Sequence, residues 1–356
     1  MEKIRVLVVD DSSVVRRVVT EELTAQPDLE VAGSAATGRI ALDMMTRTNP
    51  DLIILDIEMP EMDGLTALTH LRQSHPRTPV IMFSSLTELG AAATLEALSR
   101  GASDFFAKPA GPGGLEAARL VIRAELIPAI RALCTRKSAA ASGAGAIPKP
   151  AKPVHTHAPA AGARVDLVAI GASTGGPNAL AEIFGALPAN FPTPILVVQH
   201  MPPMFTQMLA ERLSKNSHIP TVEAKSGAEL EPGKAWVAPG DHHLIVVRDG
   251  TRVRAKVQQE PPENACRPAV DPLLRSVAGV YGGACLAVIL TGMGQDGLRG
   301  CEAISAAGGP ILVQDEATSV VWGMPGFVAR AGLADKVLPL SLLAGEIVKR
   351  VGGGRG

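Results

Sequence analysis

Short apolar runs alternate with longer stretches of helical spacing along most of the chain. In the first half the runs are Ile4–Val9, Leu29–Ala32, Leu52–Leu55, Val80–Phe83 and Asp104–Ala107. Stretches such as Ser13–Ala25 and Gly64–Gln73 lie between them. Parallel strands need long crossover connections, and helices usually supply them. This alternation therefore predicts a doubly wound α/β domain, with a parallel sheet covered by helices on both faces.

The alternation stops between Lys137 and Ala163 and then resumes. This interval is rich in Ala, Pro and Gly, has no acidic residue and shows no apolar periodicity, a composition typical of a linker. From Arg164 onward, the predicted strands are Val165–Ile170, Ile195–Gln199, Trp236–Ala238, Leu244–Val247, Cys285–Leu290 and Ile311–Gln314. The region 236–257 is a possible antiparallel hairpin around Asp249-Gly250. We therefore expect two α/β domains, at 1–125 and 164–350, joined by a helix end and linker at 126–163.

Composition excludes several classes of function. A formal charge of −1 and an aromatic content of 3% do not favour binding of nucleic acid through phosphate neutralisation or base stacking. The four cysteines form no C-x-x-C pair, which argues against structural zinc and a disulfide scaffold. The first apolar run is too short for a signal peptide, and no run approaches the roughly 18 residues of a membrane span. We expect a cytoplasmic protein without membrane insertion.

Acidic residues close two apolar runs of the first half. "VLVVDD" ends in Asp10-Asp11 and "LIILD" ends in Asp56. Because the carboxyl ends of parallel strands lie along one edge, these three carboxylates should meet in one crevice. Clustered like charges need a cation, and oxygen ligands at this density suit Mg²⁺.

Two further predicted strand ends carry groups suited to phosphoryl chemistry. "VIMFSS" places Ser84 and Ser85 as hydroxyl donors, and "DFFAKPA" places Lys108 as a cation. Each acid alone could simply cap the following helix. Acid, acid, hydroxyl and lysine at the ends of four strands instead favour a shared site.

Residues 1 to about 125 resemble a response-regulator receiver domain through "VLVVDDS", "LDIEMPEMDG", "MFSS" and "AKP", in that order. The resemblance implies that Asp56 accepts a phosphoryl group from a partner histidine kinase. It also implies that Mg²⁺ is held by Asp11, Asp56 and the backbone carbonyl of Glu58, with Asp10 acting through water. The implied switch residues are Ser84, Phe105 and Lys108.

The second half opens with a strand followed by a glycine turn, "DLVAIGASTGGPNAL". The turn lacks the G-x-G-x-x-G pattern of dinucleotide sites and the lysine of a Walker loop. Gly171 to Gly175 matches G-x-S-x-G, the pattern of a nucleophile elbow, with Ser173 as the exposed hydroxyl. A serine that only caps the helix after an ordinary strand-to-helix turn is the alternative.

A serine nucleophile requires a base and a group that orients the base. "PILVVQHMP" ends in His200, and Asp296 follows the run "CLAVILTGMG". Both lie at the predicted carboxyl edge, as Ser173 does, and this favours a triad. His200 could instead be a core histidine and Asp296 a helix N-cap, while His242, His243 and His218 compete for the role of base.

Residues from about 164 to 350 resemble the catalytic domain of the chemotaxis protein-glutamate methylesterase family, CheB. The matching stretches include "AIGASTGGP", "VVQHMPPMFT", "RPAVDPLLRS" and "ILTGMGQDG". The resemblance implies Ser173 as nucleophile, His200 as base and Asp296 as orienter. It implies an oxyanion hole at the Met293 N–H and around Thr174.

The implied activity is hydrolysis of glutamate γ-methyl esters, and deamidation of specific glutamines, on chemoreceptors. Only the receiver would need Mg²⁺; the esterase would need no cofactor. The expected partners are receptors and a histidine kinase, with the chain itself a monomer. One alternative is a receiver-gated binding module without catalysis, and another is the same hydrolase serving a non-flagellar chemosensory array.

Overall fold

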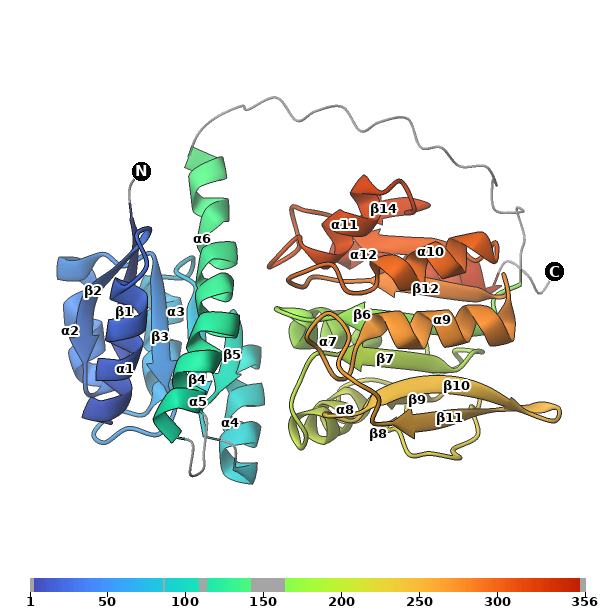
Figure 1. Ribbon diagram of the computed structural model, residues 1–356, viewed down its shortest axis with the longest axis horizontal. Helices are drawn as coiled ribbons and strands as arrows, with labels where there is room; N and C mark the ends of the chain where they lie inside the picture. The colour runs from blue at the N-terminus through green and yellow to red at the C-terminus, as the bar shows by residue number, and fades with distance from the viewer. Residues whose placement is uncertain (1–2, 86, 109–113, 142–163, 353–356) are drawn as a thin grey trace. The chain divides into compact units, whose positions relative to one another are not determined.

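The computed structural model describes residues 3–85, 87–108, 114–141 and 164–352, and Figure 1 traces them. The chain divides into two compact units, Met1–Ala146 and Ile147–Gly356. Most of the predicted linker lies outside the described residues. No helix within these ranges is both long and apolar enough to cross a membrane.

The first unit is a five-stranded parallel sheet of order β2-β1-β3-β4-β5. The strands and helices alternate along the chain: β1 (Ile4–Val9), α1 (Ser13–Thr24), β2 (Leu29–Ala35), α2 (Gly38–Thr48), β3 (Leu52–Asp56), α3 (Gly64–Ser74), β4 (Val80–Ser84), α4 (Glu88–Ser99), β5 (Asp104–Ala107) and α5 (Gly114–Val121). α1 packs against α5, and α3 packs against both α2 and α4. The strand order reverses its direction of growth between β1 and β3, which is where such sheets bind ligands.

The buried strands explain why the apolar runs predicted this sheet. Every residue of β3 and β4 is buried, as expected for central strands covered on both faces. The helices begin at polar N-caps, for example Thr37 for α2 and Asp63 for α3, whose side chains accept a backbone N–H of the first turn.

The helix after β5 is longer than a single crossover requires. α5 continues through a π-helical turn, η1 (Ile122–Leu126), into α6 (Ile127–Ala141). Arg119 and Arg123 pair with the buried Glu22 of α1, and Arg131 of α6 forms an ion pair with Asp28 at 2.8 Å. These contacts hold the helix against the first unit past residue 125.

The second unit is a seven-stranded sheet of order β14-β13-β12-β6-β7-β9-β8, parallel at every described pairing. Its strands are β6 (Leu167–Ala172), β7 (Ile195–Gln199), β8 (Thr221–Glu223), β9 (Ala235–Val237), β12 (Cys285–Ile289), β13 (Ile311–Gln314) and β14 (Lys336–Leu338). Its helices are α7 (Gly176–Ala186), α8 (Phe205–Lys215), α9 (Val270–Tyr281), α10 (Leu298–Ala306), α11 (Met324–Arg330) and α12 (Leu340–Gly352). Here the reversal of strand order falls between β6 and β12.

A separate hairpin lies beside this sheet. β10 (His243–Asp249) and β11 (Arg252–Gln258) pair antiparallel around the predicted turn, where Gly250 has a positive φ of 60°. β9 does not join the hairpin, although the sequence placed both in one region; it pairs in parallel with β7.

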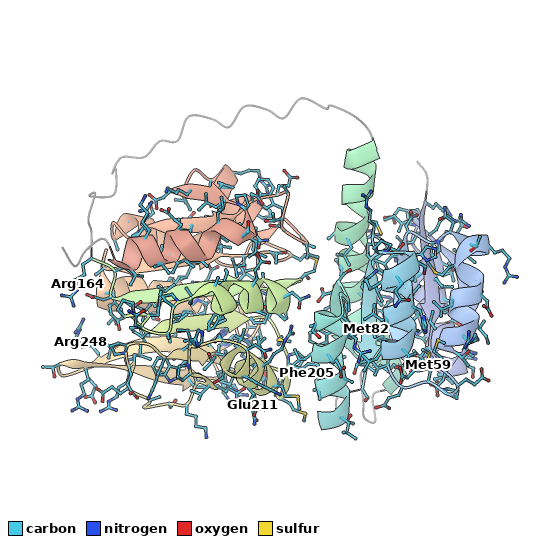
Figure 2. All side chains as sticks on the ribbon, turned by 180° about the vertical axis from the view of Figure 1, so that it is seen from behind. Met59, Met82, Arg164, Phe205, Glu211 and Arg248 are labelled. Atoms are coloured by element: carbon cyan, nitrogen blue, oxygen red, sulfur yellow. The ribbon has the colours of Figure 1, made fainter. Side chains whose placement is uncertain are left out.

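Helix burial follows side-chain type. Figure 2 labels Phe205 and Glu211, both on α8. Phe205 is fully buried, whereas Glu211 is exposed, so α8 turns one apolar face to the core and one charged face to solvent. α8 packs beside α7, and α7 also contacts α12. α9 and α10 pack together, with α9 also contacting the β10–β11 hairpin.

Candidate functional site

Three predicted residues follow neighbouring strands of the second unit. Ser173 directly follows β6, His200 directly follows β7, and Asp296 lies in the loop after β12. The backbone N–H of His200 donates to the carbonyl of Ala172 at 3.2 Å, and that of Ser173 donates to Thr291 at 3.0 Å. The strand ends thus bring Ser173, His200 and the Asp296 loop to the edge where the strand order reverses.

Glycines allow the turn at Ser173 to pack closely against its neighbours. Gly175 has a φ of +77°, which an L side chain rarely adopts. A Cβ on Gly176 would lie 1.9 Å from Oε1 of Gln199, and a Cβ on Gly292 would lie 2.8 Å from Cβ of Ser173. A side chain at any of these positions would therefore displace the turn that carries Ser173.

His200 and Asp296 form a direct pair. Nε2 of His200 lies 2.8 Å from Oδ2 of Asp296. The same carboxylate accepts the N–H groups of Val270 and Asp271 at the start of α9, at 2.6 and 3.1 Å, and of Gly297 at 3.0 Å. Asp296 is therefore a partner of His200 and also caps the start of α9. The sequence offered it as the N-cap of the helix that follows it, but α10 begins at Leu298 after the N-cap Gly297, and Asp271 accepts the N–H of Gly300 in its first turn at 2.7 Å.

The pairing shifts the pKa values of both groups. Burial alone would lower the pKa of His200, but hydrogen bonds with the Asp296 carboxylate and the Cys266 sulfur outweigh it and raise the pKa. Burial alone would raise the pKa of Asp296, but the His200 ring and the backbone N–H groups hold it below its usual value. Asp296 is thus an anion, and Nε2 of His200 carries a hydrogen.

The Ser173 hydroxyl does not form a hydrogen bond with His200, or with any other group of the described residues. Nδ1 of His200 lies 3.4 Å from Sγ of Cys266 instead. The structure therefore joins His200 to Asp296 directly and brings Ser173 near through the backbone. Hydrogen bonds to a nucleophile are often long before substrate binds, so this geometry does not argue against Ser173.

The two residues expected at an oxyanion hole flank Ser173. The Thr174 carbonyl accepts the Thr291 hydroxyl at 2.9 Å, and Met293 follows Gly292, whose carbonyl accepts the N–H groups of Gly323 and Met324. Within the described part of the chain, the N–H groups of Thr174 and Met293 have no hydrogen-bond partner. Two free N–H donors beside a serine could stabilise an oxyanion.

The acidic cluster of the first unit forms at the carboxyl ends of β1 and β3. Ligand oxygens of Asp10, Asp11 and Asp56 lie within 4.8 Å of one another. Nζ of Lys108 lies 2.7 Å from Oδ2 of Asp10 and 2.7 Å from Oδ2 of Asp56. Three carboxylates around a single lysine leave unbalanced negative charge, and these hard oxygen donors fit a divalent cation such as Mg²⁺.

The same crowding is visible in the pKa values of the cluster. Burial and the neighbouring Asp10 charge raise the pKa of Asp56 to about 6, although Lys108 opposes the shift. Burial also raises the pKa of Asp10. For Lys108, the two carboxylates outweigh burial and raise its pKa. The cluster is therefore a cationic lysine facing carboxylates that resist ionisation.

The other predicted receiver residues make contacts outside the acidic cluster. The Ser84 hydroxyl is buried, and it donates to the carbonyl of Gly90 on α4 at 3.2 Å rather than to Asp56. The side chain of Glu58 accepts the Ser85 hydroxyl at 3.4 Å. Phe105 is 9% exposed on β5.

Comparison with known proteins places both units. Residues 168–347 match the model of the family described as CheB methylesterase, and residues 6–119 match the response regulator receiver domain. The chain belongs to the CheB methylesterase family. Two relatives with the name protein-glutamate methylesterase/protein-glutamine glutaminase are similar over the full length. The one from Trichodesmium erythraeum is 52% identical, covering 99% of this chain and 100% of its own, and the one from Nocardioides is 49% identical, covering 99% and 96%.

A solved structure supports the fold of the second unit. The crystal structure of the Thermotoga maritima CheB methylesterase catalytic domain is 43% identical, with a TM-score of 0.51. It covers 52% of this chain and 98% of its own. Two parallel-sheet α/β domains, a receiver and a CheB catalytic domain, are therefore confirmed as the architecture of this chain.

Three side chains at the CheB site were not expected from the sequence. Nε2 of Gln199 donates to the Ser173 carbonyl at 2.9 Å, Asn264 donates to Asp296 at 2.9 Å, and Cys266 contacts His200. Gln199 could have been found from its place at a strand end, next to His200. Asn264 and Cys266 lie outside any predicted strand, so no periodicity marks them.

The competing histidines have other partners. His243 is buried, accepts the backbone N–H of Ala269 and contacts the Pro261 carbonyl at 3.1 Å. His242 contacts the Gly240 carbonyl, two residues away. Neither contacts Asp296. His218 is exposed, in the loop after α8.

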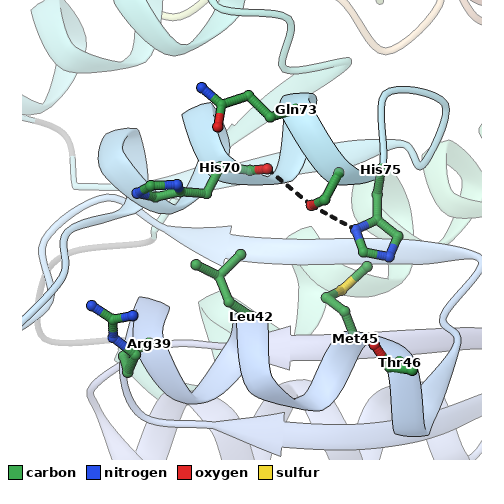
Figure 3. A pocket seen from close by; sticks show the side chains of 8 residues that line it. Arg39, Leu42, Met45, Thr46, His70, Gln73 and His75 are labelled. Atoms are coloured by element: carbon green, nitrogen blue, oxygen red, sulfur yellow. Dashed lines mark hydrogen bonds between the residues drawn. The ribbon is translucent and has the colours of Figure 1, made fainter.

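The receiver unit also has an open hollow between α2 and α3, shown in Figure 3. His70 and His75 line it together with Arg39 and Met45. The hydroxyl of Ser74 donates to the His70 carbonyl and contacts Nδ1 of His75. The Ser74 hydroxyl is thus engaged along α3, and none of the predicted phosphorylation-site residues lines the hollow.

Proposed function

We propose that this chain is a phosphorylation-activated serine hydrolase that removes γ-methyl esters from glutamates of chemoreceptors and deamidates specific receptor glutamines. The observation that carries the proposal is the His200–Asp296 pair at the strand edge beside the Ser173 turn. The names of the full-length relatives support the substrate.

In the proposed first step, the Ser173 oxygen attacks the ester carbonyl carbon and its proton passes to Nδ1 of His200. Asp296 binds the hydrogen on Nε2 and stabilises the imidazolium that forms. The N–H groups of Thr174 and Met293 bind the new oxyanion. His200 then gives its proton to the methoxide oxygen, so that methanol leaves and Ser173 stays acylated.

The second step reverses these roles with water as the nucleophile. His200 takes a proton from water, the hydroxide oxygen attacks the acyl carbon, and the proton returns to the Ser173 oxygen. The product is a glutamate side chain. A glutamine side chain would follow the same course, with ammonia leaving in place of methanol, because both substrates pass through a tetrahedral oxyanion.

The receiver would regulate this reaction. Asp56 would accept a phosphoryl group from a histidine kinase. Ser84, Phe105 and Lys108 would act as switch residues that respond to the phosphoryl group. Mg²⁺, held by Asp10, Asp11, Asp56 and the Glu58 carbonyl, would neutralise the charge of the incoming phosphoryl group. The four cysteines are free thiols, as in a reducing compartment, and we propose that the chain acts in the cytoplasm as a monomer.

The test is release of labelled methanol from methyl-labelled receptor membranes. The full chain, treated with a small phosphodonor and Mg²⁺, should release methanol, and the Ser173→Ala variant should not. Equal release by both proteins would refute the proposal.

A further inference from the structure

A tight turn lies against the His200–Asp296 pair. The backbone N–H of Glu263 donates to the Cys266 carbonyl at 3.1 Å, and that of Cys266 donates back to Glu263 at 2.8 Å. The two residues between them, Asn264 and Ala265, have φ values of 52° and 61°. A left-handed backbone costs about 1 kcal/mol or more at an alanine, so this turn is not the conformation of least local strain.

The first residue of the turn reaches the carboxylate of Asp296. Nδ2 of Asn264 lies 2.9 Å from Oδ1 of Asp296 and 3.0 Å from Oδ2 of Asp271. Both carboxylates are nearly inaccessible to solvent, with exposures of 2% and 1%. One amide group thus donates to two buried acids at once and separates their charges.

The last residue of the turn reaches the other half of the pair. Sγ of Cys266 lies 3.4 Å from Nδ1 of His200. Because Nε2 of the ring already faces Asp296, Asp296 and Cys266 together hold both ring nitrogens of His200. Asn264 and Cys266 point to different partners, so the strained turn presents one side chain to each member of the pair.

We propose that the turn Glu263–Cys266 is a positioning element of the esterase, in which Asn264 fixes the Asp296 carboxylate and Cys266 fixes the ring of His200. The inference rests on the proposed function. Neither side chain needs to touch the substrate. Cys266 acts through His200, and Asn264 acts through Asp296, the partner of His200.

The contacts indicate what each side chain does. With Asn264 on Oδ1, the Oδ2 atom of Asp296 is left facing His200, which keeps hydrogen on Nε2 and the lone pair on Nδ1. The Cys266 sulfur then contacts Nδ1, which is the nitrogen that must receive the proton of Ser173. Cys266 therefore fixes the orientation of the imidazole ring before substrate binds. It also influences the pH range in which His200 is neutral.

The charged and titratable groups facing His200 come from two elements. Asp296 faces it from the loop after β12, and Cys266 faces it from the turn; Asp271 of α9 is linked to the pair through Asn264. Removing the sulfur should lower the pKa of His200, since Cys266 is one cause of its rise. The acid limb of the esterase profile should then move to lower pH.

The first arm of the test compares two glycine variants of the turn in the full chain. Asn264→Gly and Ala265→Gly both relieve a left-handed residue, but only the first removes the amide. We expect Asn264→Gly to lower kcat for methanol release about tenfold with KM within about twofold, because a hydrogen bond to a buried charge is lost. Ala265→Gly should stay within about twofold of the wild type.

The second arm records the pH dependence of kcat for Cys266→Ala and Cys266→Ser. Both should shift the acid limb to lower pH, because neither carries a thiol. The serine variant keeps a hydrogen-bonding group and should retain more of the optimal kcat than the alanine variant does.

The outcomes separate this inference from the proposed function. If wild type and Ser173→Ala release methanol equally, the proposed function fails. If wild type alone is active, the positioning role is overturned by Asn264→Gly and Ala265→Gly losing activity equally, or by a Cys266→Ala profile that coincides with wild type. Should Asn264→Gly lose its folded structure by circular dichroism, the Cys266 profile decides.

Discussion

Substitution of each residue of the proposed catalytic site should have a distinct effect on ester hydrolysis and stability. Ser173→Ala removes the proposed nucleophile and should reduce ester hydrolysis to background, while leaving the fold and the expected phosphorylation of Asp56 intact. His200→Ala should be similarly severe, because serine then has no base. Methanol release and circular dichroism check both variants. Retention of most of the activity by Ser173→Ala would place the nucleophile elsewhere.

Asp296 needs a different comparison, since it also caps α9. We expect Asp296→Ala to retain more catalysis than Ser173→Ala, because loss of an orienting group is usually the milder defect. It should also lower the thermal unfolding midpoint, which Ser173→Ala should not do. Calorimetry of the two variants tests this, and equal midpoints would contradict the capping role.

We expect the receiver to become more stable when one negative charge of its acidic cluster is removed. Without Mg²⁺, Asp56→Asn should raise the unfolding midpoint of the receiver transition, since it removes an anion whose pKa is raised to about 6 by burial and by Asp10. Mg²⁺ should stabilise wild type more than the variant. The exposed Asp43→Asn serves as control.

Phosphorylation of the same cluster gives a second readout. Labelling of wild type by a small phosphodonor should require Mg²⁺, and Asp56→Asn should take up no label. An equal label on the variant would assign the acceptor to another residue, whatever its effect on stability.

Some of these residues could be predicted and others could not, for a physical reason. Ser173, His200 and Asp10 directly follow central strands. Asp56 is the last residue of another, so the apolar pattern that marks a strand also marks its end. Asn264 and Cys266 reach the site through a turn with two left-handed residues and no glycine, in a segment without periodicity. Cys266 was identifiable only as one of four unpaired cysteines.

At the scale of elements, α7 offers two glycines with opposite expectations. A Cβ on Gly176 would meet Oε1 of the buried Gln199 at 1.9 Å, and this amide holds the carbonyl of Ser173. Gly176→Ala should therefore lower both stability and esterase activity. Gly185 is exposed on the same helix, with its nearest atom at 4.0 Å, and Gly185→Ala should stabilise by up to about 1 kcal/mol.

Thermal unfolding and methanol release of the two variants distinguish these expectations. A Gly176→Ala protein as active and as stable as Gly185→Ala would mean that Gln199 can move aside freely, and that the nucleophile turn does not depend on it.

Most elements were predictable because central strands carry long apolar runs. β3, β4, β7, β12 and β13 are wholly buried, and their runs stood out. β8 and β14 were missed. Each has three residues at an edge of the sheet, with only partial burial, which is too short to show a pattern.

At the scale of the whole molecule, each unit has its own site, so regulation requires that phosphorylation change the equilibrium between two states. We predict that the receiver restrains the esterase by occlusion. A fragment beginning at Arg164 should hydrolyse receptor esters faster than the unphosphorylated full chain, and it should not respond to a phosphodonor.

Methanol release by both proteins, with and without phosphodonor, tests this. A hundredfold activation of the full chain requires only about 2.7 kcal/mol of differential stability. A fragment slower than the unphosphorylated whole would exclude simple occlusion and would mean that the receiver assists the reaction.

The double engagement of Asp296 has a consequence for how this protein can change over generations. A descendant released from its chemical task could lose Ser173 without harm to folding, whereas loss of Asp296 would also loosen the start of α9. Inactive descendants should therefore retain the aspartate long after the serine has gone. In such lineages an intact Asp296 would indicate only that the fold of the domain is preserved. The presence or absence of Ser173 would indicate whether the domain can still act as an esterase.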